Sequence, residues 1–242
     1  MAMVLEKVVP FGRSLDEYQK MFNLTAADFA GQILGVADGP ASFNAEGTKQ
    51  GYSITSIDPI YNFTGVDIQS RFDAVVNGII EQIKNTPDDW VWDYHHSPDA
   101  LRLSRERSLQ LFLADYDTGK RAGRYITAEL PTLPFVDQQF DLAVCSHFLF
   151  LYSAHFDKDF HLRSLQELLR VAKEVRVFPL LTLMLERSPY LDSMIQTLQA
   201  TYDVAIQPVG YELQRGGNEM LVVRSRLSRT NGENAKPSSV MV

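Results

Sequence analysis

Seven apolar segments recur along this chain, and the way they are connected limits the fold more than any other feature. The first five have the length of buried strands, and helical patterns separate most of them: 32–36, 52–57, 124–128, 140–146 and 175–181. This alternation predicts parallel strands joined by right-handed crossovers. The last two, 204–209 and 219–224, are linked by residues 210–218, too few for a crossover helix. We therefore predict a mostly parallel α/β sheet that ends in an antiparallel hairpin.

Helical patterns complete one predicted domain, residues 1–227. A capping box at Ser14 to Glu17 begins an N-terminal helical segment, 12–31. Residues 66–123 exceed one crossover and form a predicted helical insertion over the sheet edge: an apolar stripe runs from 68 to 83, and a second helix begins at Ser97-Pro98 and stops at Gly119. A later helix begins at Ser188-Pro189. The polar segment 228–242 is predicted to be a disordered tail.

Composition narrows the class of partner. With 242 residues and 45% hydrophobic content the chain can bury a single core. Its net charge of -7 argues against nonspecific binding to a nucleic-acid backbone, which depends on Lys and Arg, but leaves a specific RNA substrate open. The one cysteine, Cys145, closes no internal disulfide, and residues 1–11 lack a secretory apolar core, so we expect a cytoplasmic protein. The longest apolar run, 177–185, is too short to span a membrane.

The end of the first apolar segment has the composition of a ligand-binding turn. Residues 33–41 read ILGVADGPA, a strand followed by a small-residue turn where backbone can approach a ligand. Asp58 ends the second segment, 19 residues after Gly39, where nucleotide-binding folds place an acid on a ribose diol. The two signals together predict a nucleotide-like ligand at this edge of the sheet.

A third motif precedes the fourth segment. Residues 128–141 read AELPTLPFVDQQFD. With the first turn and Asp58, this resembles the class I (Rossmann-like) S-adenosylmethionine-dependent methyltransferases, whose third motif commonly reads Gly-Asp-Ala-x-x-Leu-Pro-Phe before a Phe-Asp that opens strand four. The resemblance covers residues 32–224 apart from the insertion, and implies a seven-stranded methyltransferase sheet with a helical insertion after strand two.

The resemblance also implies a set of site residues. Asp58 would accept hydrogen bonds from both ribose hydroxyls, beside Pro59 at the adenine, and Glu129 would accept from the adenine amino group while the N–H of Leu130 donates to the ring. Ser146 would face the sulfonium and the acceptor. Five residues would surround the methionine part of the cofactor, near a helix N-terminus that favours its carboxylate: Gly35, Ala37, Asp38, Gly39 and Ala41.

The first motif departs from the family pattern. The family favours an acid followed by Gly-x-Gly-x-Gly, whereas this chain has Gly35 and then Ala37, Gly39 and Ala41. Alanine permits close approach but restricts φ more than glycine does. The Pro-Gly-Gly common before strand five is also missing, and Pro179, which lacks an N–H, is expected at the end of that strand.

Other reactive side chains give weaker signals. His147, at a strand end, is the predicted general base or acceptor contact because its titration range suits that task. Cys145 shares its strand face, but no further ligand has suitable spacing, so we predict a buried structural cysteine and no metal site. Tyr18 and Phe22 fit either a lid on the cofactor or core packing. A cluster of basic residues mixed with acids is typical of a solvated helical face, with an anionic-substrate site as the alternative: Arg102, Arg105, Arg107, Lys120, Arg121 and Arg124.

These observations favour a methyltransferase that uses S-adenosylmethionine, releases S-adenosylhomocysteine and acts on a small-molecule acceptor. One alternative is an NAD(P)-dependent oxidoreductase, against which stand the absent Gly-x-Gly-x-x-Gly spacing and the antiparallel end. Another is a non-enzymatic binding module in which the two alanines mark lost cofactor affinity. The sequence leaves a monomer and a homodimer equally open.

Overall fold

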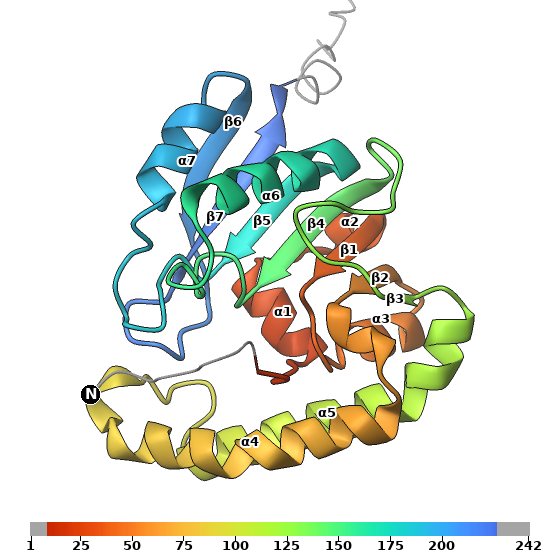
Figure 1. The fold of residues 1–242 in the computed structure, drawn as a ribbon, viewed down its shortest axis with the longest axis vertical. Coiled ribbons are helices and arrows are strands. Elements are labelled where there is room, and N and C mark those ends of the chain that lie inside the picture. The colour runs from red at the N-terminus through yellow and green to blue at the C-terminus, as the bar shows by residue number, and fades with distance from the viewer. Residues whose placement is uncertain (1–8, 227–242) are drawn as a thin grey trace, which may run out of the picture.

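The computed structural model of the chain describes residues 9–226, so the predicted tail at 228–242 lies outside the described residues. Figure 1 shows the elements. In chain order they are α1 (Leu15–Met21), α2 (Ala26–Phe29), β1 (Gln32–Val36), α3 (Phe43–Lys49), β2 (Ser53–Ile57), the 3-10 helix η1 (Pro59–Asn62), α4 (Gly65–Asn85), η2 (Pro87–Asp89), α5 (Pro98–Arg121), β3 (Tyr125–Ile126), β4 (Phe140–Ser146), α6 (Lys158–Val171), β5 (Ala172–Phe178), α7 (Leu191–Leu198), β6 (Tyr202–Pro208) and β7 (Glu219–Ser225).

The seven strands form one sheet in the order β3-β2-β1-β4-β5-β7-β6. The first five strands run parallel, and β7 pairs antiparallel with both β5 and β6. The predicted parallel sheet with an antiparallel end is therefore confirmed, and it is the sheet of the class I methyltransferase fold. Strands β2 and β3 are added on one side of β1, and β4 and β5 on the other, so the strand order reverses between β1 and β4. Open α/β sheets bind ligands at such a point.

Two hydrophobic cores, one on each face of the sheet, explain why the strands read as continuous apolar runs. In β4, Leu142 and Val144 pack against α1, α4 and α5, while Ala143 and Cys145 pack against α6 and α7. Successive side chains of a strand point to opposite faces, so a strand covered on both sides is apolar throughout. This is why the predicted bounds of β1 and β4 match those of the structure.

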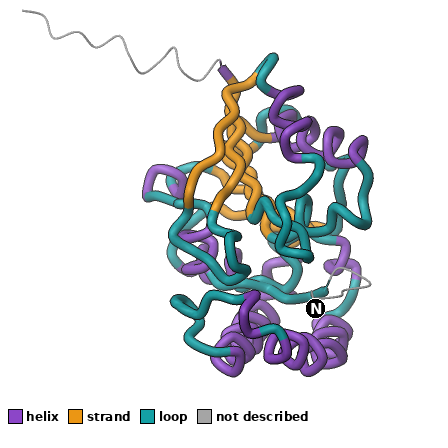
Figure 2. The backbone as a smooth tube through the Cα atoms, turned by 90° about the vertical axis from the view of Figure 1, so that its left-hand side faces the viewer, coloured by secondary structure: helices purple, strands orange, loops and turns teal. Residues whose placement is uncertain are grey.

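The predicted insertion contains the helix pair α4 and α5, which lie side by side across the lower end of the molecule in Figure 1. Figure 2 shows that loops lie between the sheet and this pair. The C-terminal part of α5 packs on edge strand β3 through Tyr116 and Tyr125, whose rings are 5.6 Å apart. The buried stripe of α4, from Ile68 to Ile83, faces the core. The pair therefore covers both the sheet edge and the end where the parallel strands stop.

Several predicted boundaries were wrong: β3 ends two residues before the predicted Ala128, β6 begins two residues before the predicted Val204, and both ends of β5 and the bounds of two helices were misplaced. Strand β5 begins at Ala172, three residues before the predicted start, because Lys173 and Glu174 extend from its solvent end and pair with Asp141 and Arg224. It ends at Phe178, so Pro179 follows the strand as expected.

The helix boundaries erred for other reasons. Gly119 does not end α5: a Cβ there would lie 2.4 Å from the Tyr125 ring, so close packing explains this glycine, and Gly123, with φ of +74°, follows the helix end. Helix α7 begins at Leu191 because the Ser188 hydroxyl bonds that of Ser153 at 2.7 Å.

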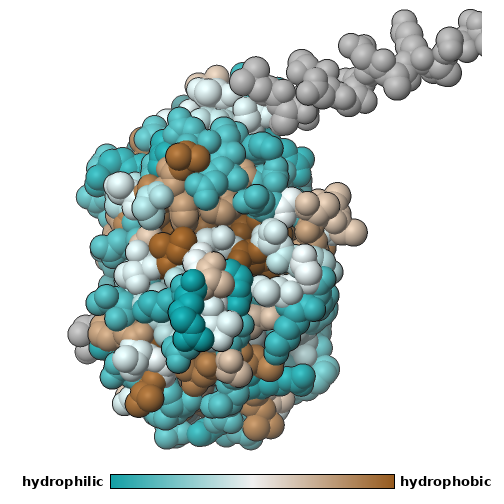
Figure 3. Space-filling model, turned by 90° about the vertical axis from the view of Figure 1, so that its right-hand side faces the viewer, coloured by the Kyte–Doolittle hydropathy of each residue, from teal (hydrophilic) through white to brown (hydrophobic). Residues whose placement is uncertain are grey.

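Within residues 9–226, no helix is both long and apolar enough to cross a bilayer. Large hydrophobic side chains that are strongly exposed occur singly at Val66, Leu103, Val136 and Met184. On the face in Figure 3, hydrophobic groups are small and separated by hydrophilic ones. Scattered exposed hydrophobic residues are normal in folded proteins and indicate no particular partner.

Candidate active site

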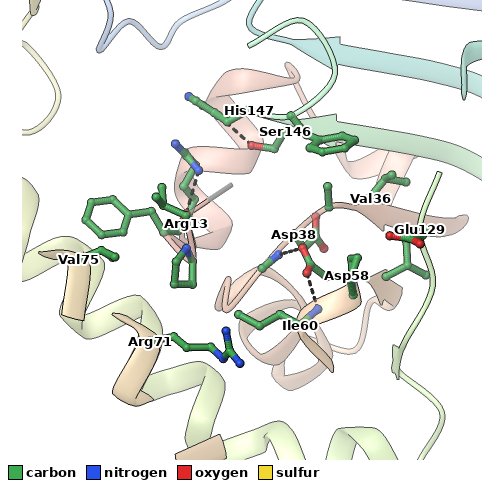
Figure 4. Close-up of a pocket in the computed structure, with 18 of the residues that line it drawn as sticks. Arg13, Val36, Asp38, Asp58, Ile60, Arg71, Val75, Glu129, Ser146 and His147 are labelled. Atoms are coloured by element: carbon green, nitrogen blue, oxygen red, sulfur yellow. Dashed lines mark hydrogen bonds between the residues drawn. The ribbon is translucent and has the colours of Figure 1, made fainter. Parts of the chain in front are cut away.

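A pocket of about 840 Å³ lies where β1, β2 and β4 end. The residues that directly follow these strands, Ala37, Asp58 and His147, all line it. Helix α4 forms the opposite wall with Arg71 and Val75, as Figure 4 shows. The volume falls within the range of about 300 to 1,000 Å³ typical of small-molecule sites.

The turn after β1 is held in a left-handed conformation. Ala37 and Gly39 both have φ of +55°, and the N–H of Ala37 donates to the carbonyl of Ile57 at 2.9 Å. The Tyr61 hydroxyl fixes the same turn by donating to the carbonyl of Gly39 at 2.8 Å. A left-handed alanine costs about 1 to 2 kcal/mol relative to the right-handed form, and such strain clusters at functional sites.

The departure from the family motif has a spatial explanation in Asp38. A Cβ on Gly35 would lie only 1.9 Å from Oδ2 of Asp38, so the Asp38 carboxyl occupies the space that a side chain at position 35 would fill. It accepts hydrogen bonds from the hydroxyls of Tyr18 and Ser56, both at 2.6 Å. Burial raises its pKa to about 7, and the Asp58 charge adds to this against the two hydroxyl donors. The carboxyl of Asp38 thus lies next to position 35, where the family motif has an acid.

Asp58 connects the β1 turn to the end of β2. Its Oδ2 accepts from the N–H of Gly39 and its Oδ1 from the N–H of Ile60, both at 2.8 Å. Burial and, to a smaller extent, the charge of Glu129 raise its pKa to about 6 against the effect of the two N–H donors. Each oxygen has one backbone donor, so each keeps a lone pair for a ligand hydroxyl.

Glu129 approaches the same pocket from the segment after β3. It is exposed, and Figure 4 shows it beside Asp58 across the end of β1, whose last residue is Val36. Neither its carboxylate nor the N–H of the buried Leu130 has a hydrogen-bond partner within residues 9–226. The two acids from consecutive strand ends therefore face one cavity with acceptors to spare.

Ser146 and His147 close the pocket at the end of β4. Their Oγ and Nδ1 atoms are 3.0 Å apart, and His147 takes φ of +49° while its N–H donates to the carbonyl of Phe178. Burial and the positive charges of Arg13 and Arg105 hold the pKa of His147 well below its usual range. This shift favours the neutral imidazole, and the role of His147 as general base or acceptor contact stays a prediction.

The structure brings most of the predicted site residues together. Gly35 and Ala41 do not line the pocket, because Asp38 covers the first and the second is a core residue exposed by only 2%. Cys145 is fully buried, and burial raises its pKa to about 12. Residues 9–226 contain no metal-binding cluster of His, Cys, Asp or Glu. The predicted residues in the lining are Ala37, Asp38, Gly39, Asp58, Pro59, Glu129, Leu130, Ser146 and His147.

The sequence analysis missed the cationic and aromatic side of the pocket. Arg13 and Arg71 project into it from opposite walls in Figure 4, and phenylalanines such as Phe63 and Phe156 line it. The prediction of a solvated face was wrong for Arg105, which is 1% exposed and bonded to Glu17 at 2.7 Å. Among these residues, only Arg105 belonged to a pattern noted in the sequence, because the basic cluster that contains it had an anionic-substrate site as its alternative interpretation.

Comparison with known proteins shows that the chain is similar in sequence to a curated protein along nearly its whole length. It is 35% identical over 221 residues to the uncharacterized protein MJ0045 of Methanocaldococcus jannaschii, a match that covers 91% of this chain and 97% of the relative. No family model matches the chain.

Solved structures resemble it more distantly. Magnesium protoporphyrin IX methyltransferase from Synechocystis PCC 6803, with bound S-adenosylmethionine, is 10% identical and has a TM-score of 0.42 over 81% of this chain and 70% of that one. A Thermotoga maritima protein described as a possible histamine N-methyltransferase is 11% identical, with a TM-score of 0.41 over 89% of each chain. Because these identities are low, the fold assignment rests on the strand order. From its identity to MJ0045 the chain belongs to the family of that Methanocaldococcus jannaschii protein, and its fold is that of the class I methyltransferases.

Proposed function

We propose that this protein is an S-adenosylmethionine-dependent methyltransferase that acts on a small-molecule acceptor and releases S-adenosylhomocysteine. The observation that carries the proposal is the placement of Asp58 and Glu129, two acids from consecutive strand ends, on one pocket beside the β1 turn. The volume of about 840 Å³ has room for a nucleoside-sized cofactor and a small acceptor together.

The free hydrogen-bonding atoms fit an adenosyl group. Asp58 retains an acceptor lone pair on each carboxylate oxygen for the two ribose hydroxyls. Glu129 and the N–H of Leu130 supply an acceptor and a donor for the edge of the adenine. The β1 turn, with Gly39 free of any Cβ contact, leaves room for the methionine part near Ala37 and Asp38.

The residues of the chain act mainly by binding and positioning. When bound, S-adenosylmethionine supplies an activated methyl group, and transfer requires the acceptor to lie in line with it and water to be excluded. Ser146 and His147 stand where the acceptor would approach, and apolar side chains such as Phe148 exclude water. A neutral His147 accepts a proton or hydrogen bond from the acceptor without first losing a proton of its own.

A ligand panel tests the proposal. Thermal unfolding of the full chain is measured with S-adenosylmethionine, S-adenosylhomocysteine, NAD and NADP, for the natural protein and for Asp58→Asn. A ligand at a hundred times its Kd stabilises the fold by about 2.7 kcal/mol. We expect the two adenosyl ligands to stabilise the natural protein, and Asp58→Asn to bind them at least tenfold more weakly because it loses a charged hydrogen-bond acceptor.

The control is Asp192→Asn, an exposed acid in the first turn of α7, which should bind both ligands like the natural protein. Stabilisation by NAD or NADP alone would favour the oxidoreductase. No response to any of the four ligands would favour a module without cofactor affinity.

A further inference from the structure

A second, smaller pocket of about 80 Å³ adjoins the active-site pocket and contains most of the unsatisfied polar atoms of the structure. Among the described residues, four buried side-chain atoms have no hydrogen-bond partner. Three of them belong to residues of this pocket: Nε of Arg13, Nη2 of Arg105 and Oε1 of Gln214. Buried polar groups are almost always paired, so the two unpaired guanidinium donors indicate a missing acceptor group on a ligand, whereas Oε1 of Gln214 requires a donor.

The small pocket is an inner extension of the large one. Five residues line both pockets: Val9, Phe11, Arg13, Ile79 and His147. A molecule whose reactive part lies near His147 can therefore extend its other end past Arg13 toward Arg105. We call this inner extension the arginine chamber.

Among the described residues, the charges around the arginine chamber do not balance. Arg105 is neutralised by Glu17, whose carboxylate oxygens lie 2.7 and 2.9 Å from Nη1 of Arg105. Within residues 9–226 Arg13 has no carboxylate partner, and its guanidinium donates only to the carbonyl of Phe11 at 2.9 Å. Burial and the charge of Arg105 lower the pKa of Arg13. Glu17 also lies close enough for its charge to act on Arg13, so two guanidinium groups share one carboxylate, and the excess positive charge favours an anionic ligand.

The large pocket continues this site with apolar walls. Phe11, Phe63, Val75 and Phe156 line it on the side of Arg13 and α4. We propose, building on the proposed methyltransferase function, that the acceptor is an apolar carboxylic acid whose carboxylate occupies the arginine chamber between Arg13 and Arg105. The guanidinium groups donate to the carboxylate, and the apolar body lies against the phenylalanines.

Calorimetry on the full chain tests this with a pair of matched probes, 3-phenylpropanoate and its neutral amide, each titrated with and without saturating S-adenosylhomocysteine. We expect the carboxylate to bind at least tenfold more tightly than the amide. Arg13→Gln should reduce this preference to twofold or less, whereas Arg13→Lys should keep part of it because the charge remains. Arg121→Gln, an exposed arginine at the end of α5, is the matched control and should keep the full preference.

A second titration distinguishes the acceptor from the methionine carboxylate of the cofactor. If Arg13 serves the acceptor, Arg13→Gln binds S-adenosylhomocysteine with a Kd within threefold of the natural protein. A larger loss that spares 5′-methylthioadenosine, which lacks the amino acid part, would assign Arg13 to the cofactor and overturn the proposal.

Equal binding of acid and amide, or no binding of the acid, would also overturn the proposal. A preference for the acid in a protein that fails to bind S-adenosylhomocysteine would uphold the anion site and refute the methyltransferase.

Discussion

The buried carboxyl of Asp38 makes stability depend on pH in an unusual direction. Its pKa is raised to about 7 from an ordinary 3.8, so between these values the folded protein holds a proton that the unfolded chain has lost. The free energy of unfolding therefore falls as pH rises through this range. At about 1.36 kcal/mol per pKa unit the whole difference corresponds to about 4 kcal/mol, of which about 3 kcal/mol falls between pH 5 and pH 8.

The substitution Asp38→Asn isolates this effect because an amide does not titrate. Its altered hydrogen bonds to Tyr18 and Ser56 change stability equally at every pH and cancel in the comparison. We expect urea unfolding of the ligand-free proteins to show the natural protein losing about 3 kcal/mol relative to Asp38→Asn from pH 5 to pH 8. The exposed Asp192→Asn serves as control. Parallel pH curves for the natural protein and Asp38→Asn would refute a protonated buried Asp38.

Three further outcomes follow from the β1 turn and the end of β2. Ala37→Gly should raise the free energy of unfolding by about 1 kcal/mol in urea, since glycine adopts φ of +55° freely; an unchanged value would contradict the left-handed turn. Gly35→Ala should lower the free energy of unfolding by about 2 to 3 kcal/mol, because the added Cβ displaces Asp38. In an Asp38→Ala background the same substitution should cost under about 1 kcal/mol. Equal costs in both backgrounds would show that the two positions do not compete for space. An ionised Asp58 is the better hydrogen-bond acceptor, and its pKa is about 6. The Kd for S-adenosylhomocysteine should therefore rise about tenfold per pH unit below pH 6, and Asp58→Asn should abolish that slope. A pH-independent Kd in calorimetry would remove Asp58 from the ribose site.

The sheet could be predicted from the sequence because burial on both faces leaves a continuous apolar signature. Strands β1 and β4 show this most clearly. Strand β5 begins in charged residues that pair with neighbouring strands, and such pairing is invisible in a single segment, so its start was misplaced. The capping box at Ser14 was readable because its partner, Glu17, lies three residues away.

The acidic half of the candidate site was predictable for a similar reason. Asp58 directly follows β2 and Glu129 lies three residues beyond β3, so the order of the strands places both near one edge of the sheet. The arginines differ, because their environment depends on distant segments. Arg105 is buried only because Glu17, 88 residues earlier in the chain, neutralises it, and the surrounding helix otherwise has a solvated composition. The position of the Asp38 carboxyl next to Gly35 likewise depends on the three-dimensional conformation of the turn, so it could not be predicted from the sequence.

Helix α1 is part of the fixed scaffold around the candidate site and does not act as a lid. Swinging it outward would strand the Arg105 cation without Glu17 and strip Asp38 of its Tyr18 donor, and breaking one such buried ion pair alone costs about 3 to 5 kcal/mol. Tyr18 and Phe22 are accordingly core residues, exposed by 1% and 0%. A ligand that enters or leaves the pocket must therefore pass while this helix stays in place.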